Sequence, residues 1–329
     1  MERPTIYSLA EQLRISPSTV SRAFSDPGKV RRELREQILL AAEKAGYYPH
    51  NAARALSTGR SGLVGVLMPD VTNPFFPQLL SGLIKAARRR EAELLFIDSA
   101  EASQSETRLV ARVQGQVDAF IFASPRSPVE DLVSAIGNKP VTCINRIVEG
   151  VSSTYVDDDD AILGAVAHLR MLGHERVALV GGPSNSWTAQ RRAAAALSAA
   201  SSLGIELVHL GSFPASFDGG LQSAPAVVRS RATAVLAFDD VSAFGVVSGL
   251  AAMGLHVPGD VSVVGCDDVP FASMMTPQLT TITAPVRQVA EAAVDLLYRL
   301  IQHGVAEAGT VIPFRSAFVV RGTTSARPA

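Results

Sequence analysis

The stretch TIYSLAEQLRISPSTVSRAFS at residues 5–25 decides the fold of the first part of this chain. Its first half follows a possible N-cap, Thr5, and places four apolar residues on one helical stripe: Ile6, Leu9, Ala10 and Leu13. Its second half comes after the short turn RIS. There Ser16 can cap a helix, and Pro17 suits the first helical turn, where the missing N–H is tolerated. The stretch therefore predicts two short helices joined by a tight turn.

The second of these helices, at about residues 17–24, has little to bury. Val20 and Ala23 or Phe24 turn inward, which leaves an outer face of small hydroxyl groups and one cation: Ser18, Thr19, Ser21 and Arg22. Such a face can enter the major groove of DNA, where these side chains reach base edges and phosphates. An ordinary capped surface helix has the same pattern, and the pattern alone does not separate the two readings.

A third helix is expected at about residues 32–45, with Leu34, Ile38, Ala41 or Ala42 and Ala45 toward the same small core and Gly46 ending it. The next stretch, YYPHNAARALSTGR at 47–60, has room for about two helical turns. It can order on DNA and insert Leu56 as a wedge in the minor groove, or it can be a plain linker. Residues 1–60 hold 10 Lys and Arg against 6 Asp and Glu, a net charge of +4, whereas the rest of the chain carries -5. Only the first segment is therefore suited to a polyanion.

Length and composition limit the class of protein. The 329 residues predict about two domains. No apolar run approaches the ~18 residues of a membrane span. The N-terminal sequence reaches the polar residues Glu11 and Gln12 before it could form the apolar region of a secretory signal peptide. We therefore expect a cytoplasmic protein without membrane contact. Cys143 and Cys266 lie in apolar runs without CxxC or metal spacing, which predicts buried free thiols, and no metal or cofactor is expected.

From residue 61, apolar strand patterns alternate with helical ones in two sets: GLVGVLMP, ELLFID, VDAFIFAS and KPVTCIN, then RVALVGG, ELVHL, TAVLAF and DVSVVGCDD. This alternation predicts parallel sheets covered on both faces in two similar α/β subdomains. Ligands of such sheets bind beyond the carboxyl ends of the strands. The residues there are candidates for a ligand site: Asn73, Phe75, Phe76, Ser124, Arg146, Trp187, Arg192, Phe213, Asp240 and Asp267. Their aromatic faces, arginines and carboxylates suit a small polyhydroxylated ligand.

Several motifs together resemble the LacI/GalR family of bacterial transcriptional repressors: TIYSLAEQLRISPSTVSRAFS, GYYPHNAARAL, GVLMPDVTNPFFPQLLSGL and LTTITAPV. The resemblance implies a lambda-repressor-like helix-turn-helix head at 1–46, a hinge segment with a hinge helix at 47–60, and a core at 61–329. It implies that the core is a type I periplasmic-binding-protein-like pair of doubly wound α/β subdomains. The first subdomain would comprise about 61–156 and 284–308, and the second about 157–283 and 309–323.

The family also implies roles for individual residues. A homodimer would bind double-stranded operator DNA through residues of the head and hinge: Thr5, Tyr7, Ser16, Pro17, Ser18, Thr19, Ser21, Arg22, His50, Asn51, Ala53, Arg54 and Leu56. A small-molecule effector, expected to be a carbohydrate, would bind in the core, with Phe75, Arg192 and Asp240 as the leading contacts. The implied function is that of an effector-controlled repressor and not that of an enzyme.

The chain departs from the family pattern at three places. Arg14 replaces the glycine usual between the first two helices, where a left-handed backbone is needed, at a cost of about 1 kcal/mol. His50 replaces the usual Asn at the start of the hinge helix. Arg31 replaces the usual Ser before the third helix, where it can add a phosphate contact.

Other motifs and classes are less favoured. The acids of VDDDDAIL at 156–163 fit a helix start better than a cation site, and AARRRE at 86–91 fits a solvated face. An exported solute-binding protein would need a signal peptide, and a sugar-processing enzyme would need a nucleophile, base and orienting acid that no motif supplies. A gel shift on the gene's upstream DNA, beside a substrate-depletion assay, separates these classes.

Overall fold

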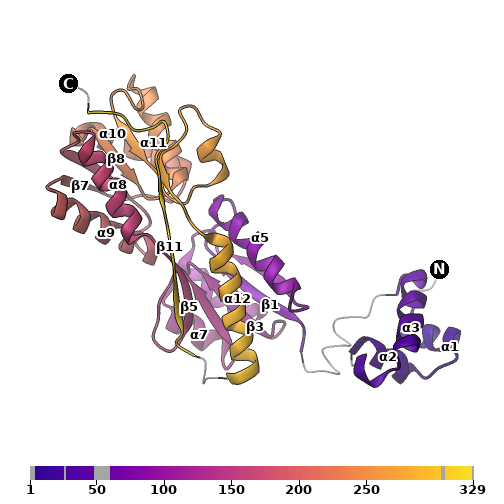
Figure 1. The fold of residues 1–329 in the computed structure, drawn as a ribbon. Coiled ribbons are helices and arrows are strands. Elements are labelled where there is room, and N and C mark those ends of the chain that lie inside the picture. The colour runs from indigo at the N-terminus through magenta and orange to yellow at the C-terminus, as the bar shows by residue number, and fades with distance from the viewer. Residues whose placement is uncertain (1–3, 26, 48–59, 305–307, 328–329) are drawn as a thin grey trace. The chain divides into compact units, whose positions relative to one another are not determined.

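The computed structural model describes residues 4–25, 27–47, 60–304 and 308–327. The chain divides into two compact units (Figure 1). One comprises Met1–Leu63 with Gln116–Asp118, and the other comprises Val64–Gly115 with Ala119–Ala329.

The first unit contains a small helical head. Its elements are α1 (Ile6–Leu13), α2 (Pro17–Ser25), the 3-10 turn η1 (Pro27–Lys29) and α3 (Arg32–Ala45). They pack around a core of Leu9, Ala10, Val20, Ala23, Ile38, Ala41 and Ala42. Thr5 caps α1, because its hydroxyl accepts from the Ser8 amide at 3.2 Å while the Ser8 hydroxyl accepts from the Thr5 amide at 2.9 Å. The predicted three helices are confirmed, although Ala45 is exposed and does not join the core.

The turn between α1 and α2 requires a left-handed residue. Arg14 occupies it with φ 54° and ψ 43°, and its amide donates to the carbonyls of Ala10 and Glu11. The left-handed backbone expected at this position is therefore present without a glycine. A left-handed conformation costs about 1 kcal/mol for a residue other than glycine, and the Arg14 side chain is exposed.

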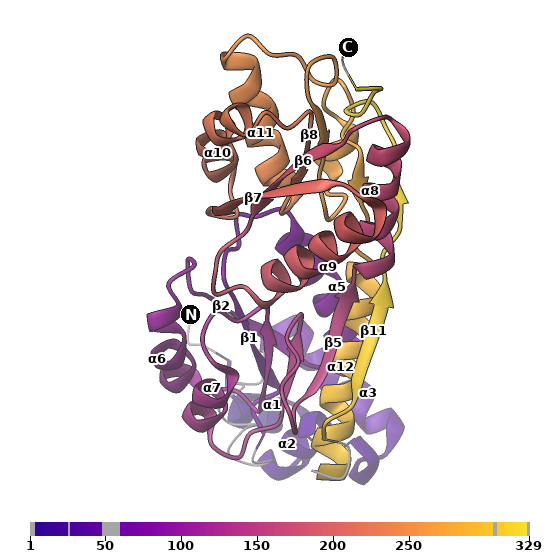
Figure 2. The ribbon, with the colours of Figure 1, turned by 90° about the vertical axis from the view of Figure 1, so that its left-hand side faces the viewer.

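The larger unit holds two lobes, and the first, called the N-lobe, is built on a six-stranded sheet. Its strands are β1 (Leu63–Met68), β2 (Glu93–Asp98), β3 (Ala119–Ala123), β4 (Val141–Ile144), β5 (Ser152–Asp157) and β11 (Val311–Arg315), in the order β11-β5-β4-β3-β1-β2. Helices α6 (Ser103–Val113) and α7 (Val129–Ile136) lie on one side of it, and α5 (Phe75–Arg88) and α12 (Val286–His303) on the other (Figure 2). Exposed ion pairs from Arg89 to Glu291 and from Arg90 to Asp295 connect the end of α5 to α12, and residues 88–91 of AARRRE lie on a solvated face, as predicted.

Strand β11 corrects the predicted subdomain boundary. The prediction assigned 309–323 to the second subdomain, but β11 pairs in parallel with β5 of the N-lobe sheet, with Val311 opposite Ser153. Pro313 is accommodated because β11 is an edge strand. Strand β5 itself was absent from the predicted set because its buried residues are polar; for example, the Thr154 hydroxyl donates to the Val289 carbonyl of α12 at 3.2 Å.

The second lobe, called the C-lobe, is built on a four-stranded parallel sheet in the order β7-β6-β8-β9. These strands are β6 (Arg176–Gly181), β7 (Glu206–Ser212), β8 (Ala234–Ala237) and β9 (Ser262–Val264). Around them lie α8 (Asp159–Met171), α9 (Trp187–Leu203), α10 (Phe217–Ser230), α11 (Asp240–Ala252) and the turn η2 (Pro270–Ser273), with a short antiparallel pair of β10 (Thr281–Ile282) and β12 (Phe318–Val319). The predicted parallel α/β subdomains are confirmed. Both cysteines, Cys143 in the N-lobe and Cys266 in the C-lobe, are buried free thiols as expected.

Helices α10 and α11 approach each other through glycines. A side-chain carbon added to Gly245 would overlap the carbonyl oxygen of Phe217, and one added to Gly220 would overlap the carbonyl oxygen of Ser242. Backbone therefore packs directly on backbone, which leaves no room for a methyl group between the two helices.

Three segments connect the lobes, and hydrogen bonds join them to one another. The Ser316 hydroxyl, after β11, donates to the carboxylate of Asp158, after β5, at 2.6 Å. The Ala317 amide donates to the hydroxyl of Thr283, between β10 and α12, at 3.0 Å. The connections thus form a single bonded set at the lobe junction.

Candidate functional site

Contacts at both ends of α2 fix the helix so that its outer face is exposed to solvent. The Ser16 hydroxyl accepts from the Thr19 amide at 3.1 Å, which fixes the beginning of α2. At its end, Arg35 of α3 donates to the Ala23 carbonyl at 3.3 Å. Because Val20 and Ala23 are fully buried, the opposite face of α2 must face outward.

Most of the predicted DNA-contacting residues of the head lie in α2 or just before it, and Thr5 and Tyr7 lie at the beginning of α1. Those exposed to solvent are Thr5, Tyr7, Ser16, Pro17, Ser18 and Arg22, and those half-buried are Thr19 and Ser21. Tyr7 has 72% of its surface exposed, which is unusual for a large aromatic side chain. The other predicted contacts lie outside the described residues: His50, Asn51, Ala53, Arg54 and Leu56.

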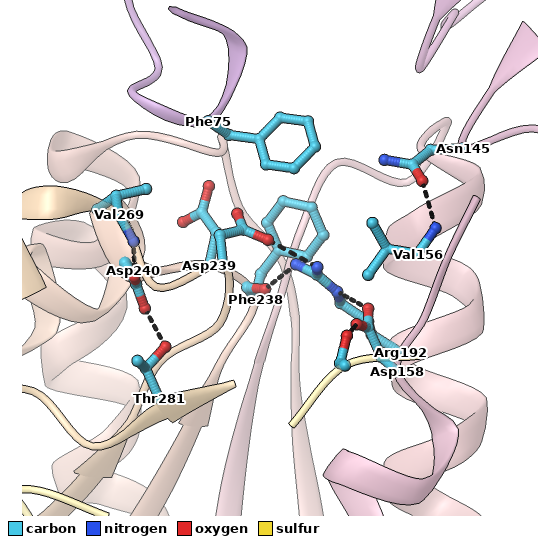
Figure 3. A network of polar contacts seen from close by, with 12 residues as sticks. Phe75, Asn145, Val156, Asp158, Arg192, Phe238, Asp239, Asp240, Val269 and Thr281 are labelled. Atoms are coloured by element: carbon cyan, nitrogen blue, oxygen red, sulfur yellow. Dashed lines mark hydrogen bonds and ion pairs between the residues drawn. The ribbon is translucent and has the colours of Figure 1, made fainter. Parts of the chain in front are cut away.

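A pocket of about 380 Å³ lies at the carboxyl ends of the strands of both lobes. From the N-lobe it is lined by Asn73, Phe75, Phe76, Ser124, Arg126 and Asn145, and from the C-lobe by Ser186, Thr188, Arg192, Ala215, Phe238, Asp239 and Asp267. Figure 3 shows the Phe75 and Phe238 rings with the Asp239 carboxylate beside them and Arg192 extending toward Asp158. Polar and aromatic groups therefore converge on one open pocket.

Arg192 of α9 forms the charged centre of the pocket. Its Nε donates to Asp158 and its Nη2 to Asp267, both at 2.7 Å, and its Nη1 donates to the Phe238 carbonyl at 2.8 Å. Burial raises the pKa of the Asp267 carboxyl to about 7, although Arg192 opposes this shift. The carboxylate of Asp158 also accepts from Ser316 and makes no capping bond to α8, which begins at Asp159 within the acidic run, as predicted.

Asn73 and Asp239 join the two lobes across the pocket. The Asn73 Nδ2 donates to Asp239 at 3.0 Å, while its Oδ1 accepts from the Phe75 amide at 3.1 Å at the start of α5. The other oxygen of Asp239 accepts from the Ser242 amide at 2.7 Å and so caps α11. The beginnings of α5 and α11 are thereby linked through two short side chains.

Arg126 brings a second guanidinium to the pocket. Its Nε and Nη2 donate to the two carboxylate oxygens of Glu101, each at 2.7 Å, and its Nη1 donates to the Ser124 carbonyl at 3.0 Å. Below it, Glu106 is fully buried and accepts from the amides of Arg126 and Ser127. These groups form a compact ionic cluster after strands β2 and β3.

Six of the ten predicted ligand contacts meet in the pocket: Asn73, Phe75, Phe76, Ser124, Arg192 and Asp267. Four do not line it: Arg146, Trp187, Phe213 and Asp240. Trp187 instead packs edge-on against Tyr155, with the Arg191 guanidinium 5.2 Å from its ring centre. Phe213 packs against the apolar core of the C-lobe, and Arg146 is half-buried outside the lining.

Asp240 is part of the fold and not of the pocket wall. It is fully buried, its carboxylate accepts from the Val269 amide at 2.8 Å, and the Thr281 hydroxyl donates to its other oxygen. Burial, with the nearby Asp267, raises the pKa of Asp240 well above its usual value. The neighbouring Asp239 lines the pocket in its place, because helix α11 begins between these two residues.

Replacing Asp240 tests this structural role. Asp240→Asn keeps the size and shape of the side chain and avoids the cost of a buried charge, so we expect a change in unfolding free energy below about 1 kcal/mol. Asp240→Ala leaves the Val269 amide and the Thr281 hydroxyl buried without partners, so we expect a loss of roughly 3 kcal/mol. Denaturant unfolding of both variants measures the difference. Equal losses in the two variants would contradict the assignment.

The sequence prediction missed seven lining residues: Arg126, Asn145, Ser186, Thr188, Ala215, Phe238 and Asp239. Asn145 and Asp239 each stand one position before a predicted residue, so the strand-end rule was correct to within one residue. Ser186 caps α9, because its hydroxyl accepts from the Ala189 amide, and the sequence analysis did not single it out. No local sequence pattern marked Arg126 as a lining residue, because its position at the pocket depends on its ion pair with Glu101.

Comparison with known proteins agrees with this arrangement. Residues 5–50 match the description "Bacterial regulatory proteins, lacI family", and residues 166–324 match "Periplasmic binding protein-like domain". The ribose operon repressor of Bacillus subtilis (strain 168) is 30% identical over 323 residues, which cover 97% of this chain and 98% of that protein. Catabolite control protein A of Priestia megaterium is 27% identical, with coverage of 95% and 98%.

Two solved structures extend the similarity to three dimensions. The lac repressor dimer bound to operator and the anti-inducer ONPF superposes with a TM-score of 0.85 at 26% identity, covering 99% of this chain and 100% of that one. A LacI family regulator from Enterococcus faecium with bound ribose superposes with a TM-score of 0.72 at 27% identity, covering 80% and 99%.

A helix-turn-helix head followed by a two-lobed core with a ligand pocket defines the class of ligand-responsive transcriptional regulators. The chain belongs to the LacI family of bacterial regulatory proteins. It is accordingly a DNA-binding regulator of transcription and not an enzyme. Within the described residues, no helix has the length and apolar character needed to cross a bilayer.

Proposed function

We propose that this protein is a cytoplasmic repressor that binds a pseudo-palindromic operator as a homodimer and responds to a sugar or sugar derivative. The observation that carries the proposal is the pocket itself, in which Arg192, Asp239 and the Phe75 ring meet at the strand ends of both lobes. Charge-assisted hydrogen bonds and aromatic faces are the groups that bind polyhydroxylated molecules. The ribose operon repressor of Bacillus subtilis and the ribose-bound regulator from Enterococcus faecium support a carbohydrate effector.

The homodimer follows from symmetry and from the lac repressor dimer on its operator. One head offers few base contacts, and two heads related by a two-fold axis double them on a palindromic site. Each head would read its half-site with α2, through Ser16, Pro17, Ser18 and Arg22, while Arg31, exposed at the start of α3, would add a phosphate contact.

Effector control would act through the lobes. A ligand shifts an equilibrium only by binding one arrangement of the protein better than another. A ligand in the pocket would compete for the Asn73–Asp239 link and for Arg192, whose partner Asp158 is bonded to Ser316 at the lobe junction. Strand β1 follows residues 47–60 directly in the chain, so movement of the N-lobe would reach the hinge segment.

The experiment that tests the function has two arms. A gel shift with the gene's upstream DNA measures operator binding, and a thermal-shift screen of sugars and nucleosides measures effector binding. A ligand at 100 times its Kd raises the unfolding free energy by about 2.7 kcal/mol. Compounds that stabilise the protein must also change its operator affinity. A stabilising sugar that leaves the gel shift unchanged at every concentration would contradict effector control.

Arg22→Ala tests the reading face. Arg22 is exposed in the last turn of α2. If the Arg22 guanidinium makes a bidentate hydrogen bond to a guanine, we expect the substitution to weaken operator binding by about 1–3 kcal/mol. The affinity for random DNA should change little. Fluorescence anisotropy on both duplexes at one salt concentration measures the two affinities. An equal loss on both would assign Arg22 to phosphate. Arg112→Ala, an exposed arginine of α6, is the matched control.

A further inference from the structure

The two arginines of the pocket are each neutralised by acids of the protein itself. The side chain of Arg126 is only 4% exposed and forms a two-point ion pair with Glu101. The side chain of Arg192 is 10% exposed and pairs with both Asp158 and Asp267. A buried arginine that already holds a carboxylate has little remaining attraction for a second anion.

The charge balance around the pocket is negative. The two lining arginines, Arg126 and Arg192, stand against two lining acids, Asp239 and Asp267, and against two acids that pair with them from outside the lining, Glu101 and Asp158; Asp267 is partly protonated at neutral pH because burial raises its pKa to about 7. Glu106 adds another buried acid beneath Arg126. Coulomb interactions are strong where water is excluded, so a phosphate group placed here would meet repulsion from these acids. A neutral molecule would not.

Hydrogen-bonding capacity nevertheless remains. A guanidinium has five N–H groups, and the bonds described above use three on Arg126 and three on Arg192. The N–H groups beyond these can donate to hydroxyl oxygens, and the lone pairs of Asp239 and Asp267 can accept from hydroxyl groups. The rings of Phe75 and Phe238 supply apolar faces. The pocket is thus rich in partners for hydroxyl groups but lacks a cation free for an anion.

The position of Glu101 is maintained against an unfavourable backbone. Ala100 and Glu101 have φ angles of 49° and 60°, in the left-handed region that favours glycine. The loop is fixed by the Ala100 amide, which donates to Asp98 at 2.9 Å, and by the Glu101 amide, which donates to the Pro69 carbonyl at 2.6 Å. This conformation brings the carboxylate of Glu101 onto Arg126. Strain of this kind is often associated with a functional site.

We propose that the pocket selects an uncharged polyhydroxylated ligand over its phosphorylated counterpart, and that Glu101 sets this selectivity by neutralising Arg126. The proposal rests on the effector pocket of the proposed function and adds the charge class of the ligand. Glu101 is 33% exposed at its side chain, whereas Arg126 is buried, so removing the acid would leave a buried cation open to an incoming anion.

Matched pairs of compounds test the selectivity in the full-length protein. The probes are D-ribose with D-ribose 5-phosphate, D-glucose with D-glucose 6-phosphate, and adenosine with its 5′-monophosphate. Thermal shift and titration calorimetry at equal concentrations give the order of affinity within each pair. We expect the neutral member to bind the parent protein more tightly wherever a pair binds. A phosphorylated member that binds more tightly, or a panel in which no neutral member binds, would overturn the proposal.

Variants at Glu101 test its role. Glu101→Gln preserves size and removes the charge, so we expect the affinity for phosphorylated members to rise by about tenfold, the factor supplied by one strong charge-assisted interaction. Glu101→Asp keeps the charge and should keep the parent's selectivity. Glu93→Gln removes an exposed carboxylate of β2 outside the pocket and should behave as the parent. Unchanged phosphate affinity in Glu101→Gln would overturn the assignment to Glu101.

Operator binding separates this proposal from the proposed function. The same preparations are assayed by gel shift without any ligand, and circular dichroism verifies their folding. If the unsubstituted protein does not bind the operator, the repressor assignment is contradicted, whatever the ligand panel shows. Normal operator binding with the wrong order of affinities would contradict only the charge selectivity.

Discussion

Arg192→Met is expected to destabilise the larger unit by about 3–5 kcal/mol, because it leaves Asp158 and Asp267 buried without their counter-ion. The same variant should no longer respond to the effector, since the guanidinium lines the pocket. Chemical denaturation measures the first effect, and ligand titration of operator binding measures the second. Arg170→Met, an exposed arginine of α8, should change neither.

Neutralising the two acids should rescue the fold. The triple variant Arg192→Met, Asp158→Asn, Asp267→Asn removes the uncompensated charges and should recover most of the lost stability, without recovering the ligand response. Failure of this rescue would mean that the packing of Arg192, and not its charge, matters.

The pH dependence provides an independent check on the same ion pair. The pKa of Asp267 is raised to about 7 from 3.8 because burial outweighs the attraction of Arg192. Between these values the folded protein holds a proton that the unfolded chain has lost. The contribution of this group to stability therefore decreases as the pH rises from about 4 to about 7. Removing Arg192 favours the protonated form further, so the variant's deficit should be smaller at pH 5 than at pH 8. A deficit independent of pH would contradict this mechanism.

Gly245→Ala is expected to destabilise the C-lobe by about 3 kcal/mol, although it adds only one methyl group. The new carbon would overlap the carbonyl oxygen of Phe217 and lie 2.7 Å from the Leu221 amide nitrogen. Both are backbone atoms of α10, so the clash can be relieved only by moving the whole helix. The melting temperature, measured by calorimetry, should fall by several degrees.

The same substitution elsewhere provides the control. Gly259→Ala places its methyl group at an ordinary contact distance of 3.8 Å from His256, in an exposed turn, and should be nearly neutral. Two pocket-lining residues, Ala215 and Asp239, come just before the beginnings of α10 and α11, so Gly245→Ala should also weaken ligand binding. A Gly245→Ala protein as stable as the parent would show that the two helices can separate at little cost.

The sequence predicted those parts of the fold that apolar periodicity marks. The three head helices and the eight apolar strand runs were found, because each buries a regular stripe or an apolar run. Strand β5 was missed because its buried serines and threonines satisfy their hydroxyl groups within the structure, as Thr154 does on α12. Strand β11 was assigned to the wrong lobe because its partner, β5, is far away in the chain.

The candidate site was predicted less completely, for reasons that lie in three-dimensional contacts. The strand-end rule located the loops but could not decide which of two adjacent aspartates faces the pocket. That choice depends on the N-cap of α11, which Asp239 supplies and which turns Asp240 toward Thr281. Arg126 and Glu101 are 25 residues apart, and their pairing requires left-handed backbone conformations at Ala100 and Glu101. No local sequence pattern predicts such a pairing.

The pairing of β11 with β5 also has a consequence during synthesis on the ribosome. Val311 lies opposite Ser153, so the two paired positions are separated by 158 residues of chain (311 minus 153). At a translation rate of about 5–20 residues per second, β11 is synthesised roughly 8–30 s after β5. During that interval the backbone N–H and C=O groups of β5 form an open edge, which another nascent chain can pair with. Fast translation of the message between these two positions therefore shortens the period in which this edge is open.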